Sequence, residues 1–148
     1  MKTKLLATLF LIASLTLAGC GARANSLIAQ ITLTPSKTAI VGKVMTNASG
    51  KTLPLTKTVV RLAIVFWNED KSEGAFVLEG GSSPSAISNE KGEFAFTNLD
   101  PKDYVVVVGD MMGDNVIIAE PDGKAKIFTP ESDKTLDIGV LEVSLVQP

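Results

Sequence analysis

The feature that most constrains this chain is a period-two alternation of side chains in short stretches. At residues 93–97, EFAFT, Phe94 and Phe96 occupy one phase and small or polar residues occupy the other, as in a strand with one buried face. Strand-like stretches recur at intervals of about ten residues, separated by turns rich in Gly, Asn, Asp and Pro. No amphipathic helix pattern follows residue 20. The sequence therefore predicts an all-β fold, a single β-sandwich of about seven strands.

Residues 58–67, TVVRLAIVFW, are apolar on both phases except at Arg61. Such a stretch indicates a strand that is covered on much of both faces, so we expect it at the centre of a sheet. The polar loop NEDKSEG follows at residues 68–74. Trp67 therefore stands at the junction between a central strand and an exposed loop.

The first residues have the layout of a secretory signal peptide. Lys2 and Lys4 precede an almost wholly apolar run at residues 5–17, which is shorter than the roughly twenty residues that a membrane-spanning helix needs. The sequence Leu-Ala-Gly-Cys that ends at Cys20 resembles the lipobox of bacterial lipoproteins. The resemblance implies cleavage before Cys20 and a diacylglyceryl group on its sulfur. Further acylation, for example by palmitate, would anchor the chain stably, because two acyl chains hold a protein where one does not.

The expected organisation follows from this anchor. Residues 1–19 form a lipoprotein signal peptide, residues 20–37 a lipidated tether, and residues 38–148 the β-sandwich. The expected location is extracytoplasmic, on the cell membrane or the outer membrane. Cys20 is the only cysteine, so the domain forms no internal disulfide and depends on its own core.

Composition excludes most catalytic chemistries. The chain has no histidine, which removes Ser–His and Cys–His nucleophile systems and the usual zinc, iron and copper sites. Without its signal peptide the net charge of −2 becomes about −4, and no basic patch with interleaved aromatics is present. We therefore expect no enzyme activity, no cofactor, no metal and no nucleic-acid partner.

A longer pattern carries a family resemblance. Gly42-Lys43-Val44, Gly50, Pro54-Leu55 and GEFAFTNLDPKDY at residues 92–104 resemble the carboxypeptidase-regulatory-like group, whose relatives are transthyretin and the Cna protein B-type repeats. The resemblance covers about residues 38–146. It implies a prealbumin-like or Ig-like β-sandwich and leaves the function open, because this fold hosts many activities.

The same motif assigns structural roles. Five residues are expected to build the fold: Phe94, Phe96, Leu99, Pro101 and Tyr104. The two phenylalanines would fill the space between the sheets, Leu99 would tuck under the loop, and Tyr104 would form a tyrosine corner, with its hydroxyl bonded to the backbone upstream. Lys102 stands where the family usually has glycine, so we expect a type I turn at Pro101.

Three residues are candidates for contact with a ligand or partner. Trp67 could stack on a sugar or peptide, and Met111 and Met112, in a predicted loop, could form an adaptable apolar contact. As the last residue of a very apolar strand, Trp67 is more often part of the core or its edge, and the alternative for the two methionines is packing against the end of the sandwich. The favoured function is a binding or structural module for an envelope protein or a surface polymer. A carbohydrate or small-ligand module that uses the loops near Trp67 is the alternative, and a hydrolase with paired carboxylates is the least favoured.

Three weaker patterns concern cation binding and an internal covalent bond. In residues 68–79, Asn68, Asp70, Ser72 and Glu79 occupy positions one, three, five and twelve of a calcium-binding loop. The glycine stands one residue later than such a loop requires. Four acids, at positions 110, 114, 120 and 122, could crowd at one end of the sandwich, although turn roles are expected there. Cna-type repeats often carry a lysine–asparagine or lysine–aspartate isopeptide bond, for which the candidates here are Lys43 and Asp137, with Glu93 or Glu79 as the promoting acid.

Overall fold

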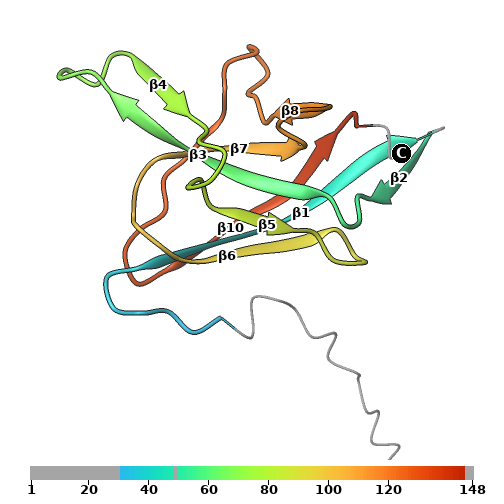
Figure 1. The fold of residues 1–148 in the computed structure, drawn as a ribbon, viewed down its shortest axis with the longest axis horizontal. Coiled ribbons are helices and arrows are strands. Elements are labelled where there is room, and N and C mark those ends of the chain that lie inside the picture. Colours follow the sequence, from blue (N-terminus) through green and yellow to red (C-terminus); the bar gives the residue numbers. More distant parts are fainter. Residues whose placement is uncertain (1–30, 49, 146–148) are drawn as a thin grey trace, which may run out of the picture.

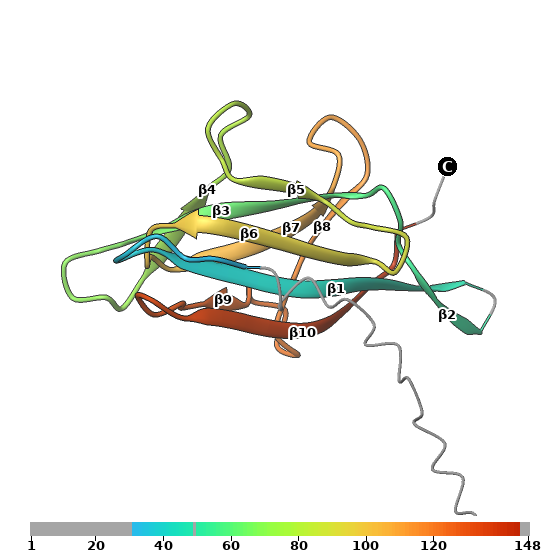
Figure 2. The same cartoon turned by 90° about the horizontal axis from the view of Figure 1, so that it is seen from below.

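The protein is a two-layer β-sandwich. The computed structural model describes residues 31–48 and 50–145, so the predicted signal peptide, Cys20 and most of the predicted tether lie outside the described residues. Figure 2 shows the two sheets as stacked layers, and no helix occurs among the described residues. The predicted all-β sandwich is confirmed.

Sheet A is built around one long strand, β1 (Thr38–Ala48). On one side β1 pairs in parallel with β10 (Thr135–Val143). On its other side it pairs antiparallel with β6 (Glu93–Leu99) along its first half and with β2 (Lys51–Pro54) along its second half. The first and last strands of the domain therefore lie side by side (Figure 1), with β1 in the middle of this layer and β10 at its edge.

Sheet B has two central strands and two divided edges. Its strands are β3 (Val59–Trp67), β4 (Gly74–Val77), β5 (Ser85–Ile87), β7 (Tyr104–Gly109), β8 (Asn115–Ile117) and β9 (Ile127–Phe128). The central strands β3 and β7 pair antiparallel, β4 and β5 share the free edge of β3, and β8 and β9 share the free edge of β7. The described residues thus form ten strands rather than about seven. At three places in the sheets, two shorter strands pair with the same side of one partner: β6 and β2 along β1, β4 and β5 along β3, and β8 and β9 along β7.

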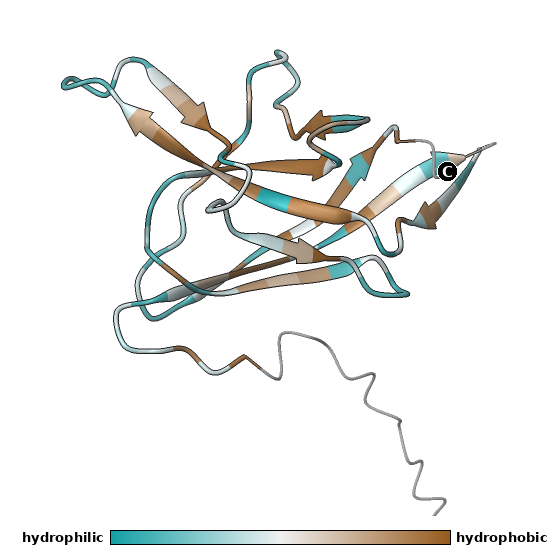
Figure 3. Ribbon diagram, viewed as in Figure 1, coloured by the Kyte–Doolittle hydropathy of each residue, from teal (hydrophilic) through white to brown (hydrophobic). Residues whose placement is uncertain are grey.

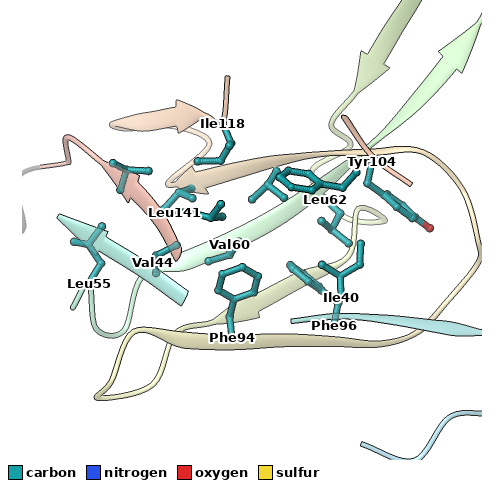
Figure 4. Packing of buried hydrophobic residues seen from close by; sticks show 14 of the residues in the cluster. Ile40, Val44, Leu55, Val60, Leu62, Phe94, Phe96, Tyr104, Ile118 and Leu141 are labelled. Carbon is teal, nitrogen blue, oxygen red and sulfur yellow. The ribbon is translucent and has the colours of Figure 1, made fainter. Parts of the chain in front are cut away.

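The hydrophobic core lies between the sheets (Figure 4). Sheet A supplies Phe94 and Phe96, which are 1% and 4% exposed and meet edge to face with ring centroids 5.7 Å apart. Alternate residues of β3 and β7 face them from sheet B, and Figure 3 shows that most of the length of both strands is apolar. The inward phase of β6 is therefore the one that the alternation predicts.

Gly42 is the position on β1 that accommodates the Phe94 ring. A Cβ atom at Gly42 would lie 2.8 Å from Phe94 Cζ and 2.8 Å from Ile138 Cγ1, closer than packed carbon atoms approach. The ring thus packs directly across the backbone of its cross-strand neighbour.

A β-bulge explains why Leu99 joins the core although it is three residues from Phe96. Thr38 pairs with Leu99 and Ile40 pairs with Phe96. One residue of β1 lies between these two pairs, whereas two residues of β6 do, so β6 carries one residue more than its partner. Asn98 takes up this extra length with a φ of 56°, which asparagine tolerates better than most residues. The strand therefore continues to Leu99, two residues beyond the regular alternation at 93–97.

The turn after β6 differs from the expected type I turn. The Lys102 amide donates to the Asp100 carbonyl at 2.9 Å, which closes a three-residue γ-turn around Pro101. The expected type I turn is therefore wrong, and the physical reason is that the fixed φ of proline also suits the centre of an inverse γ-turn.

Tyr104 forms the tyrosine corner that the motif implies. Its hydroxyl donates to the same Asp100 carbonyl at 2.9 Å, while its ring is 2% exposed in the core. Burial, with a smaller contribution from the Asp100 carboxylate, raises the pKa of Tyr104 to about 12. Tyr104 is thus committed to holding the turn against sheet B.

Candidate binding surfaces

The β3–β4 hairpin carries a group of exposed apolar side chains. Figure 1 shows it projecting beyond the sandwich, and all four residues of β4 are exposed. Four large apolar side chains on it, which we call the hairpin patch, are Phe66 (58% exposed), Trp67 (36%), Phe76 (38%) and Val77 (42%). Large apolar groups gathered on a protruding element indicate a contact surface rather than core.

The hairpin patch has two faces, because the register separates its members. Val77 lies opposite Ile64, which packs against the core, and Ala75 lies opposite Phe66. Phe66 and Val77 therefore share the face of the hairpin that points to the same side as the core residues of β3. Phe76 lies opposite Val65 and Gly74 opposite Trp67, so Trp67 and Phe76 share the face turned away from sheet A. Both faces of one ribbon are therefore apolar and accessible.

The indole of Trp67 is held in place on its face. Its Nε1 donates to Asp103 Oδ2 at 2.7 Å, and Thr129 Oγ1 donates to the other oxygen of the same carboxylate at 2.6 Å. The ring packs across Gly74, where a Cβ would lie 2.9 Å from Cε3. Trp67 is thus a pre-positioned aromatic surface, and the sequence gives no local sign of its partner Asp103, which is 36 residues away.

The structure does not bring Trp67 together with Met111 and Met112. Ile64 on β3 pairs with Tyr104, so Trp67 lies beyond the start of β7, whereas Met111 and Met112 follow its end at Gly109. Met112 is 97% exposed, and Met111 is 37% exposed. The three predicted contact residues therefore cannot form one site with a small ligand.

A groove of about 470 Å³ runs between the two sheets along their β8 and β10 edges. Its walls are mainly aliphatic, from residues 116–119 on one side and residues 138–143 on the other. Among its lining residues Glu142 is the one carboxylate, so the groove does not supply the carboxylate pair that a hydrolase of the glycosidase type needs. Lys126 also lines it and is engaged with Glu120 at 3.6 Å.

The calcium-like loop at residues 68–74 is closed by its own hydrogen bonds. Asn68 Oδ1 accepts from the Glu73 amide at 3.2 Å, and Asp70 Oδ1 accepts from the amide and hydroxyl of Ser72 at 2.9 and 2.6 Å. These bonds, chiefly those from Ser72, lower the pKa of Asp70. No group of three or more acidic, histidine or cysteine side chains is placed to hold a metal ion within residues 31–48 and 50–145.

The residues considered for an isopeptide bond lie on the outer face of sheet A. Lys43 is opposite Glu93, and Asp137 is opposite Val41, two residues before Lys43 on β1. Asp137 is exposed and accepts from the Gly139 amide at 2.9 Å, and Glu93 accepts from the Asn89 side chain at 2.9 Å. These contacts give the three side chains no buried common environment, and such chemistry would need one.

Comparisons with known proteins gave matches among solved structures. No protein-family model and no curated protein sequence matches the chain. Among solved structures, the chain is similar to a candidate carbohydrate-binding protein from Pseudomonas aeruginosa, with 17% identity, coverage of 78% of this chain and 94% of that one, and a TM-score of 0.47. A minor pilin from Streptococcus agalactiae matches at 15% identity over 77% of this chain and 47% of that chain, with a TM-score of 0.43.

A third similar structure is the dioxygenase domain of a Streptomyces dioxygenase–carbohydrate-binding fusion, with 16% identity, coverage of 76% of this chain and 84% of that one, and a TM-score of 0.37. Because all three TM-scores lie below 0.5, these likenesses assign neither a ligand nor a partner to this chain. Within the described residues, no helix is long and apolar enough to span a membrane.

Proposed function

We propose that this chain is a non-catalytic binding module, held on the extracytoplasmic side of a membrane by lipid on Cys20, which binds another envelope protein through the hairpin patch. The anchor rests on the Leu-Ala-Gly-Cys sequence after an apolar run, and the absence of catalytic activity rests on a chain without histidine and with one cysteine.

The observation that carries the proposal is the pair of apolar faces on one projecting hairpin. Phe66 and Val77 cover one face, and Trp67 and Phe76 cover the other. A sugar ring that stacks on an aromatic residue uses one face of the ribbon. A partner that covers both faces must surround the hairpin, and a groove or sheet edge in another protein provides that shape.

Site-specific photocrosslinking of the full chain in its native membrane tests this function. A photoreactive residue at position 66 or 77 should give one defined protein adduct. The same residue at Lys91, an exposed position in the turn between β5 and β6, is the matched control and should give none. Phe76→Ser should abolish the adduct formed from position 66. Equal labelling from the hairpin and from position 91, or no adduct from the hairpin, contradicts the proposal.

The fixed and exposed indole favours a second candidate, carbohydrate binding on Trp67 and Phe76. Asp103 and Gly74 hold the Trp67 ring flat on the strand, which suits stacking with an apolar sugar face. Because Trp67 is the only tryptophan, its fluorescence reports on this surface alone. Saturable emission changes with neutral oligosaccharides, lost in Phe76→Ser and kept in Phe66→Ser, would support this candidate over the protein partner.

A further inference from the structure

Arg61 is a charged side chain in the middle of an apolar strand. Val60 and Leu62 on either side of it point into the core, so Arg61 projects from the opposite face of sheet B. On this face its cross-strand neighbours are Val107 on β7 and Ser85 on β5. Arg61 therefore lies on the outer surface of the layer, in mainly apolar surroundings.

The guanidinium of Arg61 has no partner among residues 31–48 and 50–145. Its Nε is fully buried and makes no hydrogen bond, and no ion pair or hydrogen bond joins the side chain to any other residue in the described part of the chain. A buried polar atom without a partner is uncommon in proteins and loses the hydration that it has in the unfolded chain. This cost would be offset by an anion that reaches the guanidinium.

Two loops border the surface around Arg61. Residues 78–84 connect β4 to β5, residues 110–114 connect β7 to β8, and Figure 2 shows both rising from the side of sheet B that faces away from sheet A. Met111 reaches the first loop, with its Sδ and Cε 3.9 and 3.8 Å from the position that a Cβ of Gly80 would take. Val107 is only 4% exposed although it lies on this outer face, so the loops enclose the surface next to Arg61.

Acids in the two loops do not neutralise Arg61. Glu79 accepts from the Ser82 hydroxyl, and Asp110 Oδ1 accepts from the Met112 amide at 3.1 Å. Neither of these carboxylates, nor that of Asp114, lies within ion-pair distance of the guanidinium. The local charge is therefore available to a ligand.

We propose that Arg61 anchors a second binding site, distinct from the hairpin patch, which takes a carboxylate flanked by apolar groups on a peptide segment. A guanidinium recognises a carboxylate through paired hydrogen bonds from its planar fork, and no acceptor in the described part of the chain competes for Arg61. The apolar neighbours select a carboxylate next to aliphatic side chains. Val107 is buried beside Arg61, Ile117 lies opposite Val107 and is 41% exposed, and Met111 is 37% exposed. A carboxylate of this kind comes from a peptide C-terminus or from an acidic side chain between apolar residues.

Nuclear magnetic resonance of the chain from residue 20 with Cys20→Ser tests the site, because this form keeps every residue of the described domain. Two probes are titrated, acetyl-Val-Leu with a free carboxylate and acetyl-Val-Glu-Leu-amide, and acetyl-Val-Leu-amide is the uncharged control. We expect saturable amide shifts at Arg61, Ser85 and Val107 with at least one acid probe and about tenfold weaker binding of the control. The responding probe identifies the source of the carboxylate.

Variants separate recognition from folding. Arg61→Met has a similar volume and lacks the charge, so it should fold and lose the preference for acid over amide. Arg61→Lys should keep the charge and bind more weakly than the natural chain, because it lacks the fork. The proposal is overturned if neither acid probe binds, if acid and amide bind alike, or if Arg61→Met keeps the acid preference. Phe66→Ser should bind the probes normally, so failure of the hairpin proposal stays distinguishable from failure here.

Discussion

At the scale of single residues, Tyr104 shows how one side chain links the core to a turn. Its hydroxyl and the Lys102 amide share the Asp100 carbonyl, so the γ-turn and the corner are held by one acceptor. The Asp100 carboxylate pairs with Lys37 at 2.6 Å, and this hydrogen bond lowers the pKa of Asp100. Lys37 directly precedes β1, so this ion pair connects the tyrosine corner to the segment that leads into β1.

The titration of Tyr104 is directly measurable, because it is the only tyrosine in the chain. Its pKa of about 12 in the folded protein exceeds the ordinary value of 10.0, so the folded state holds a proton that the unfolded state releases. The associated stability is fully present below pH 10 and declines as the pH rises towards 12. Absorbance at 295 nm should show a midpoint near 12 in buffer and near 10 in strong denaturant.

The matched variant for this prediction is Tyr104→Phe, which keeps the buried ring and deletes the hydroxyl. It should lower the free energy of unfolding at pH 7 by about 1–2 kcal/mol through loss of the bond to Asp100. It should also flatten the decline in stability between pH 10 and 12. A native midpoint near 10 would show that the hydroxyl is not held as the structure describes.

At the scale of elements, two of the three strands that pair with β1 are bulged. β6 takes up an extra residue at Asn98, and β10 does so near Gly139, which has a φ of 73° and whose amide donates to Asp137 Oδ1. Each bulge shifts the alternation by one position, so that Leu99 in β6 and Leu141 in β10 still face the core. Bulges of this kind also bend a sheet edge and hinder pairing with another chain.

The bulged strand β6 gives a stability prediction with an internal control. Phe96→Ala removes a core ring and should cost about 3–5 kcal/mol, which is a large share of the 5–15 kcal/mol that stabilises a domain of this size. Thr97→Ala, at the next position on the exposed face, should change stability by less than about 0.5 kcal/mol. Urea unfolding of the chain from residue 20 with Cys20→Ser measures both. A neutral Phe96→Ala together with a costly Thr97→Ala would reverse the register.

At the scale of the whole molecule, the expected anchor and the proposed binding surfaces are separate features of one chain. Cys20 lies outside the described residues, and residues 21–37 separate it from the start of β1. The hairpin patch and the surface around Arg61 both belong to sheet B, while sheet A carries the entry from the N-terminal segment. The proposed contacts therefore lie on one layer of the sandwich and the chain enters through the other.

The anchor predicts a simple change in membrane behaviour. Cys20→Ser removes the thiol that would carry the lipid, so the variant should be released from the membrane or remain uncleaved, at the mass of the full 148-residue chain. Membrane fractionation with mass spectrometry measures both properties, and the natural chain is the control. A variant that is still cleaved after residue 19 and still partitions into detergent would rule out lipid attachment at Cys20.

Local patterns in the sequence were sufficient for the two stretches with the clearest alternation or the longest apolar run. Alternation at residues 93–97 predicts which ring faces inward, and the continuous apolar run at 58–67 predicts a strand covered on much of both faces. Both predictions depend only on the two-residue period of a strand and on the burial of apolar groups. The predicted lipid site at Cys20 is likewise a local pattern, which the described residues do not include.

Only the tertiary structure decided which groups stay exposed or unpartnered. The sequence places Trp67 at a strand end, but its exposure depends on a hairpin that extends past the opposing sheet, and its orientation depends on Asp103. Arg61 stands out in the sequence as a charge in an apolar strand, yet its lack of a partner depends on loops that follow β4 and β7. The parallel pairing of β1 with β10 joins residues almost 100 positions apart. Such contacts leave no local signal, because they are determined by how whole strands pack and not by the period of any one of them.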